Sequence, residues 1–80
     1  MYPDHFTVLE AAAYDLDTHG PRGAIRLDEH ITIYVGLAGF NVRYMITWDE
    51  FKASKAPSEF IFNIIRSLRQ KVIDGQEPGA

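Results

Sequence analysis

Hydrophobic and polar residues alternate along two stretches of the chain, on either side of the segment Gly36–Gly39. In the first stretch the apolar residues occupy odd-numbered positions: Ile25, Leu27, Ile31, Ile33 and Val35. In the second stretch they are Val42, Tyr44, Ile46 and Trp48. A period of two is typical of strands that bury one face. The pattern therefore predicts an antiparallel hairpin over residues 25–48.

A turn at Gly36–Gly39 fixes the register of this hairpin, pairing Val35 with Phe40 and Ile31 with Tyr44. All the apolar residues then lie on one face. The other face carries the pairs His30–Met45, Thr32–Arg43 and Tyr34–Asn41. Tyrosine, methionine, arginine and histidine are suited to protein contacts, so we expect His30, Tyr34, Arg43 and Met45 to form a docking surface. The alternative is a solvated sheet face.

Glu29 is the residue that breaks the alternation, because the register places it on the apolar face opposite Ile46. A buried carboxylate is costly unless it is paired. We expect a bulge at Asp28-Glu29, or the edge of the sheet, to leave Glu29 in water. The alternative is a buried, functional glutamate paired with Arg22 or with an arginine of a partner.

The N-terminal segment favours a helix. Thr7 and Glu10 have the spacing of a capping box, and Gly20-Pro21 is a stop signal, so we predict a helix from about Val8 to Thr18. Alternating apolar residues in this segment also allow a strand. Three consecutive alanines favour the helix.

Two further helices are predicted after the hairpin. Thr47 and Glu50 form a second capping box, which begins a short helix ending near Lys55. A long helix then runs from about Glu59, with Ser58 as its cap, to Asp74, with Gly75 as its stop.

These elements predict one small α+β domain over residues 1–75, with a flexible C-terminal tail at residues 76–80. The order is α-β-β-α-α, and the helices pack on one face of the antiparallel hairpin. A core of this size leaves little stability, about 3–5 kcal/mol, which favours association into a homodimer.

One strip of the long helix falls outside the centre of its apolar face. It consists of Phe62, Arg66, Arg69 and Ile73, spaced i, i+4, i+7 and i+11. Aromatic residues and arginine are enriched at protein interfaces, so this strip is predicted to bind a partner. The alternative is a wide core face with arginine stems lying over apolar surface.

Composition and charge narrow the function classes. The 80 residues carry a net charge of −3 and contain no cysteine, which removes disulfides and thiolate zinc sites and fits a reducing compartment. The longest nearly apolar run, Ile31–Phe40, is too short to span a bilayer, and no export segment is visible. We therefore expect a cytoplasmic protein without a membrane partner.

Candidate catalytic and metal sites are few. Asp15, Asp17 and His19 have the spacing that begins a calcium loop, but Arg26 stands where that loop needs its bidentate glutamate. A charged helix end explains these residues better. The three histidines have no serine at a diagnostic spacing, so we expect no catalytic residues, no metal and no cofactor.

Two nucleic-acid-binding families share limited features with the chain. Gly36–Gly39 is similar to the GxxG loop of KH modules, but it joins two strands and contains no basic residue. The helix–strand–strand–helix order resembles the double-stranded RNA-binding fold. That fold implies basic residues at the start of its last helix, where this chain has Pro57, Ser58 and Glu59.

The sequence thus favours a non-enzymatic protein-binding module, a small cytosolic accessory or inhibitor protein of the type that phages carry. It would bind another protein, or itself as a homodimer, through the helix strip and the sheet face. The alternative is a nucleic-acid-binding regulator that uses Arg43, Lys52, Lys55, Arg66, Arg69 and Lys71. A third hypothesis, a small enzyme or metal protein, would use Asp15, Asp17, His19 or Glu29.

Overall fold

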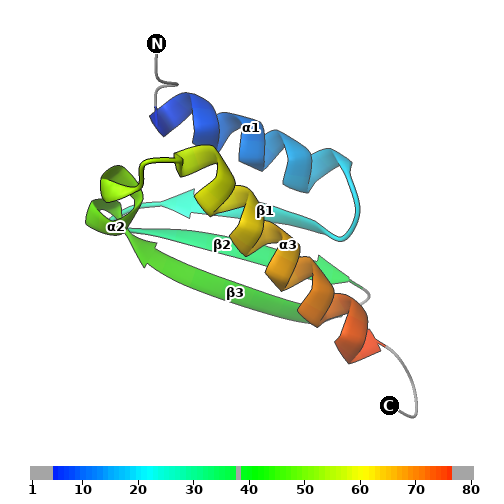
Figure 1. The fold of residues 1–80 in the computed structure, drawn as a ribbon. Coiled ribbons are helices and arrows are strands. Elements are labelled where there is room, and N and C mark those ends of the chain that lie inside the picture. The colour runs from blue at the N-terminus through cyan, green and yellow to red at the C-terminus, as the bar shows by residue number, and fades with distance from the viewer. Residues whose placement is uncertain (1–4, 38, 77–80) are drawn as a thin grey trace.

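The computed structural model describes residues 5–37 and 39–76, which form three helices and three strands (Figure 1). In chain order the elements are α1 (His5–Thr18), β1 (Arg22–Leu27), β2 (His30–Leu37), β3 (Phe40–Thr47), α2 (Trp48–Ala53) and α3 (Pro57–Gln76). The predicted α+β class is confirmed. The predicted order α-β-β-α-α lacks one strand, because the segment before the glycines folds into two strands.

The additional strand arises because the chain reverses direction at Asp28-Glu29. Asp28 N donates to the carbonyl of His30 at 3.1 Å, and His30 N donates to Asp28 Oδ1 at 3.0 Å. Leu27 then pairs with Ile31, so both remain on one face and the alternation continues through the turn. Glu29 is exposed in this turn. Its predicted position opposite Ile46 is wrong, and so is the buried-glutamate alternative.

The sheet has the order β1-β2-β3, and its second hairpin is tighter than predicted. Leu37 pairs with Phe40 and Val35 with Val42, so two residues connect β2 to β3 instead of four. Gly39 has a φ of +88°, a backbone conformation that glycine adopts at little steric cost. The predicted register is therefore wrong by two residues, a shift that leaves every side chain on its predicted face.

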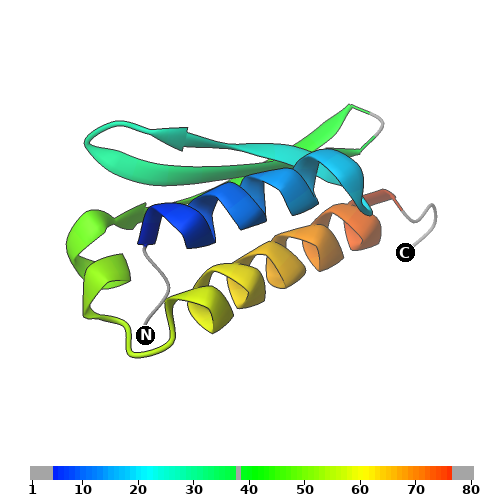
Figure 2. The same ribbon diagram turned by 90° about the horizontal axis from the view of Figure 1, so that it is seen from above.

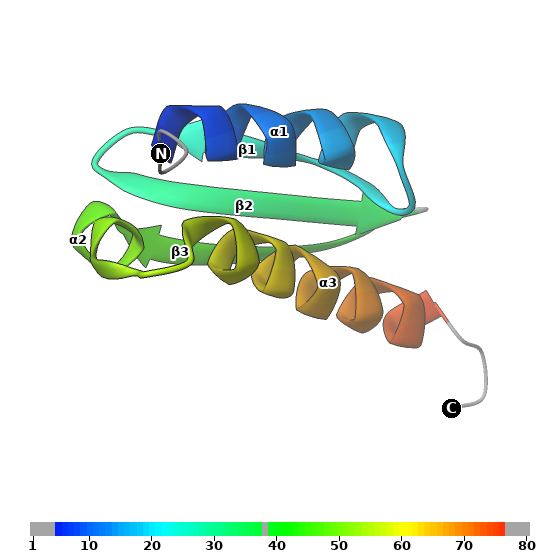
Figure 3. The same cartoon turned by 45° about the horizontal axis from the view of Figure 1, so that its top comes forward.

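Both long helices cover the same face of the sheet. Figure 2 shows the sheet as one layer and α1 and α3 together as the other. In Figure 3, α1 lies along β1, and α3 contacts β2 and β3. No helix in the described part of the chain lies on the opposite face, which carries the outward-pointing residues of all three strands.

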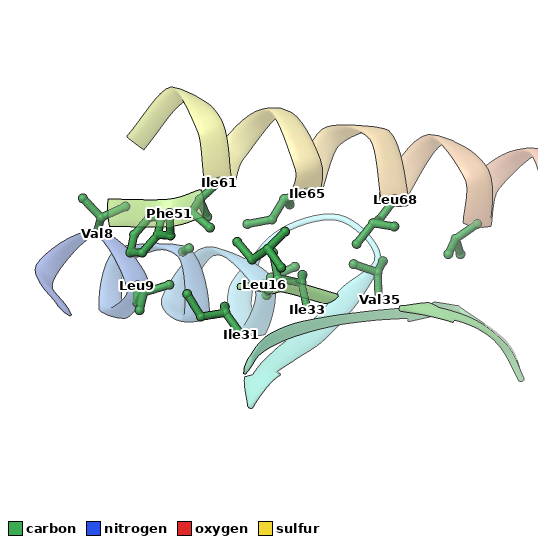
Figure 4. Packing of buried hydrophobic residues seen from close by; sticks show 13 residues of the cluster. Val8, Leu9, Leu16, Ile31, Ile33, Val35, Phe51, Ile61, Ile65 and Leu68 are labelled. Atoms are coloured by element: carbon green, nitrogen blue, oxygen red, sulfur yellow. The ribbon is translucent and has the colours of Figure 1, made fainter. Parts of the chain in front are cut away.

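The hydrophobic core fills the space between the helices and the inner face of the sheet (Figure 4). Helix α2 adds Phe51, which is fully buried and forms an edge-on contact with the ring of His5 at 5.0 Å between centroids. The buried apolar residues are Val8, Leu9, Ala12, Leu16, Ile31, Ile33, Val35, Ile46, Phe51, Ile61, Ile65, Leu68 and Val72.

The first helix confirms the helical reading of the N-terminal segment, with a corrected start. Helix α1 begins at His5, so Thr7 lies inside its first turn and is not its cap. Its end at Thr18 agrees with the prediction, and Gly20 follows with a φ of +57°. This positive φ is typical of glycine after a helix.

The cap predicted for the second helix is confirmed, because Thr47 Oγ1 accepts from Glu50 N at 3.1 Å. Helix α2 ends at Ala53, two residues before the predicted end.

Helix α3 begins at Pro57, a residue favoured in the first helical turn, and not after a cap at Ser58. It continues through Gly75 to Gln76, so Gly75 is not its stop. The rest of the predicted tail, residues 77–80, lies outside the described residues.

Candidate functional site

The sheet face on which the described part of the chain places no helix brings together residues from all three strands. We call this surface the open sheet face and define it by Arg22, Arg26, His30, Thr32, Tyr34, Arg43 and Met45. Four of them, His30, Tyr34, Arg43 and Met45, are residues that the sequence predicted for partner binding. They pair differently from the prediction: Tyr34 lies opposite Arg43, Thr32 opposite Met45 and His30 opposite Thr47.

Tyr34 occupies the centre of this face, where two hollows adjoin. A hollow of about 450 Å³ extends toward the β1–β2 turn, and one of about 540 Å³ extends toward the β2–β3 turn. Tyr34 lines both of them. Its cross-strand neighbour on β1 is Ala24, and the next outward residue of β2 is Gly36. These small residues leave the β1 side of the Tyr34 ring open.

The open sheet face has more basic than acidic side chains. Arg22, Arg26 and Arg43 place three positive charges on this face. Without them the net charge of the chain would be −6 instead of −3. Arg26 Nε lies 3.2 Å from Asp28 Oδ2, with side chains 70% and 49% exposed, so this pair contributes little to stability. Within the part of the chain that the structure describes, Arg22 and Arg43 make no hydrogen bond or ion pair.

Thr32 is a buried polar residue on this otherwise exposed face, with 5% of its surface accessible. In the register it lies between Arg26 of β1 and Met45 of β3. Thr32 is thus on the central strand, with a long side chain opposite it on each neighbouring strand. Thr32 and both of these neighbours line the hollow of about 450 Å³, as Tyr34 does.

Arg69, predicted to be part of a binding strip, is instead occupied within the molecule. Its side chain is 18% exposed and reaches the end of α1. Nη1 donates to Asp15 Oδ2 at 2.7 Å, Nη2 to the Asp15 carbonyl at 3.0 Å and to the His19 carbonyl, and Nε to the Pro21 carbonyl at 3.2 Å. Arg69 thus joins α3 to the C-terminal end of α1.

The other members of the predicted strip differ in exposure. Phe62 packs against the core, whereas Arg66 is exposed and Ile73 is 40% exposed. Together with Arg69 they line an open hollow of about 350 Å³ between α1 and α3. A partner-binding role for the strip stays a prediction, and Arg66 and Ile73 are the members with free surface.

The residues considered for metal binding or catalysis do not converge. Asp15 is bound by Arg69, and His19 Nδ1 lies 2.8 Å from Thr18 Oγ1 and 3.5 Å from Asp15 Oδ1. His5 packs on Phe51, and His30 lies on the opposite side of the sheet. Nowhere among residues 5–37 and 39–76 do three acidic or histidine side chains gather as around a metal ion.

The basic residues of the C-terminal half lie on separate surfaces. Arg43 lines a hollow on the open sheet face, Arg66 the hollow between α1 and α3, and Lys71 a hollow beside Tyr44. Lys52 lies over the Trp48 ring, 5.9 Å from its centroid. Arg43, Arg66 and Lys71 thus line three different hollows, whereas a basic patch or stripe is typical of a nucleic-acid-binding surface.

Sequence reasoning missed Arg22 and Arg26 as members of the site. The period-two pattern predicted the correct face for Arg26. Because β1 was not recognised as a separate strand, the pairing of Arg26 with Thr32 was not predicted. The tight Asp-Glu pair in the middle of an alternating run was the available signal of a turn.

Comparisons with known proteins found no relative of this chain. Neither the protein-family models nor the curated proteins nor the solved structures contain a significant match to this chain. Within the described ranges, no helix has both the length and the apolar character needed to cross a bilayer.

Proposed function

We propose that this chain is a non-enzymatic protein-binding module whose open sheet face receives an extended, acidic segment of a partner protein. One observation carries the proposal: among the described residues Tyr34 lies on a sheet face without a helix, directly opposite Arg43 and diagonal to Arg22, and neither arginine has an ion-pair partner there. Guanidinium groups bind carboxylates in a bidentate geometry, and tyrosine supplies a rigid surface and a hydroxyl group.

The shape of the surface supports an extended occupant. The two hollows follow each other along β2, and Tyr34 lines both of them. An eight-residue strand is about 26 Å long, so an extended segment of similar length would lie over both hollows. Met45, which is 55% exposed and lines the hollow toward the β1–β2 turn, supplies an apolar contact.

The distribution of charge favours a protein over a nucleic acid. Asp28 and Glu29 line the same hollow as Arg26 and His30. A nucleic-acid strand carries a negative charge at every nucleotide and would meet these carboxylates, whereas a peptide can place acidic residues beside Arg22 and Arg43 only.

The experiment is an NMR titration of the ¹⁵N-labelled protein with a synthetic peptide that alternates glutamate and valine. We expect amide shifts at Arg22, Tyr34 and Arg43, and about tenfold weaker binding for Arg22→Gln or Arg43→Gln. A charged hydrogen bond contributes about 1.5 kcal/mol, which corresponds to that factor. Lys55→Gln, at an exposed cation between α2 and α3, is the matched control and should bind as the wild type does.

Two further ligands complete the design. A peptide with lysine in place of glutamate should cause no shifts on the open sheet face, and oligo-dT should cause none at low salt. Shifts confined to the helices, or equal affinity for the glutamate and lysine peptides, would contradict the proposal. Salt-sensitive binding of oligo-dT at Tyr34 would instead support a nucleic-acid-binding protein.

A further inference from the structure

Among the residues that the structure describes, no strand pairs with the outer edge of β3, and this edge lacks the usual protection. Strand β3 is eight residues long and lies at the end of the sheet order β1-β2-β3. Arg43 is its single charged residue, and it contains no proline. Edge strands are normally protected by charges, proline, a bulge or short length, because their free N–H and C=O groups can pair with another strand. The other edge strand, β1, is shorter, follows Pro21 and carries Arg22 and Arg26.

Apolar surface accompanies this open edge. Tyr44, on the helix side of β3, is 47% exposed, and Met45, on the open face, is 55% exposed. Between Tyr44 and α3 lies an open hollow of about 250 Å³, whose lining also includes Ile64 and Leu68. The edge therefore offers a strand to pair with and, beside it, a hollow whose lining combines these apolar residues with Asn63, Ser67 and Lys71.

We propose that β3 is a self-association edge, at which two copies of this chain pair their β3 strands antiparallel about Tyr44. The product is a continuous six-stranded sheet with the helices of both copies on one side. This inference is independent of the proposed function, since the open sheet face stays uncovered in such a dimer.

The charge on β3 selects the register. A twofold axis at Arg43 would place two guanidinium groups opposite each other, which is unfavourable. An axis at Val42 would pair only residues 40–44. An axis at Tyr44 pairs residues 41–47 and places Arg43 opposite Met45 of the second copy. Tyr44 then meets Tyr44 of the second copy beside the hollow, where the two rings can pack.

The area of such an interface is sufficient for a dimer. The seven paired residues span about 23 Å, and the sheet and helix layers together are about 20 Å deep, so each copy contributes roughly 500 Å². The total of roughly 1,000 Å² reaches the lower limit of specific interfaces. We therefore expect a concentration-dependent dimer with a dissociation constant in the micromolar range or weaker.

Sedimentation equilibrium across micromolar to submillimolar concentrations tests the dimer. The wild type should change from monomer to dimer, whereas Tyr44→Lys and Tyr44→Glu should each stay monomeric because like charges meet at the axis. An equimolar mixture of these two variants should form a heterodimer. Tyr14→Lys, at an exposed tyrosine on α1, is the control and should dimerise as the wild type does.

Crosslinking gives a second readout that does not depend on how a charge at position 44 affects folding. The chain has no cysteine, so Tyr44→Cys should form an intermolecular disulfide on mild oxidation. Met45→Cys, one residue along, should form it much more slowly, because position 45 faces position 43 of the second copy. A wild type that stays monomeric, a dimer that tolerates Tyr44→Lys, or equal crosslinking at both positions would overturn the inference.

Discussion

Replacing Arg69 with methionine should destabilise the domain far more than the same change at any exposed arginine. Arg69 donates four hydrogen bonds to the C-terminal end of α1 and the residues that follow it, three of them to backbone carbonyls and one to the Asp15 carboxylate. Methionine keeps the apolar stem and removes every donor, so the loss measures the polar contacts alone.

The expected magnitude follows from the burial of the ion pair. Breaking a fully buried pair costs about 3–5 kcal/mol, whereas an exposed pair contributes about 0–1 kcal/mol. Arg69 and Asp15 are 18% and 28% exposed, between these limits, so we expect a loss of about 2–3 kcal/mol. For a domain of this size that lowers the melting temperature by about 10–20 °C.

Urea and thermal unfolding followed by circular dichroism measure this loss, with Arg66→Met on the same helix as the control. Asp15→Ala should cost less than Arg69→Met, since the three backbone carbonyls keep their donor. If Arg69→Met and Arg66→Met differ by less than about 0.5 kcal/mol, the size of an ordinary surface effect, the anchoring role of Arg69 is refuted.

Two further substitutions test the sheet and the second helix. Gly23→Ala should lower the free energy of unfolding by about 3 kcal/mol or more, because the added Cβ would lie 1.8 Å from the Tyr34 carbonyl oxygen. Gly39→Ala, whose Cβ would have nothing within 4 Å, should lower it by about 1 kcal/mol because of the positive φ alone. Equal melting temperatures for these two variants would contradict the close approach of β1 to β2. Thr47→Ala should cost about 1 kcal/mol by removing the cap of α2, and Thr47→Ser should recover most of it; an unchanged urea midpoint for Thr47→Ala would mean that the cap does not stabilise the fold.

The faces of the strands were predictable from the sequence, but their number and register were not. Period-two alternation reports only which side a residue faces. Leu27 and Ile31 lie four residues apart across the first turn, so the pattern continues as though no turn were there. A connection shorter by two residues at Gly39 shifts the register and likewise leaves every face unchanged. Both errors are therefore ones that alternation cannot detect.

In the candidate site, too, the face of a residue was predictable from the sequence, whereas its partners on distant elements were not. The sequence predicted that Tyr34 and Arg43 share an outward face, which depends on parity alone. It could not place Arg22 there, which required β1. Helical spacing grouped Arg69 with its neighbours on α3, but the residue that binds it, Asp15, lies 54 positions earlier. Spacing within one helix contains no information about such a distant partner.

Trp48 is an intrinsic fluorescence probe at one end of the sheet. Its indole Nε1 donates to the Asp28 carbonyl at 2.8 Å, and the Phe6 ring lies 6.0 Å away between centroids. Because the chain contains one tryptophan, its emission isolates the meeting point of α1, α2 and the β1–β2 turn from everything else. Fraying at this corner would change the fluorescence even while the far end of α3 stays helical, so local opening becomes observable without any label.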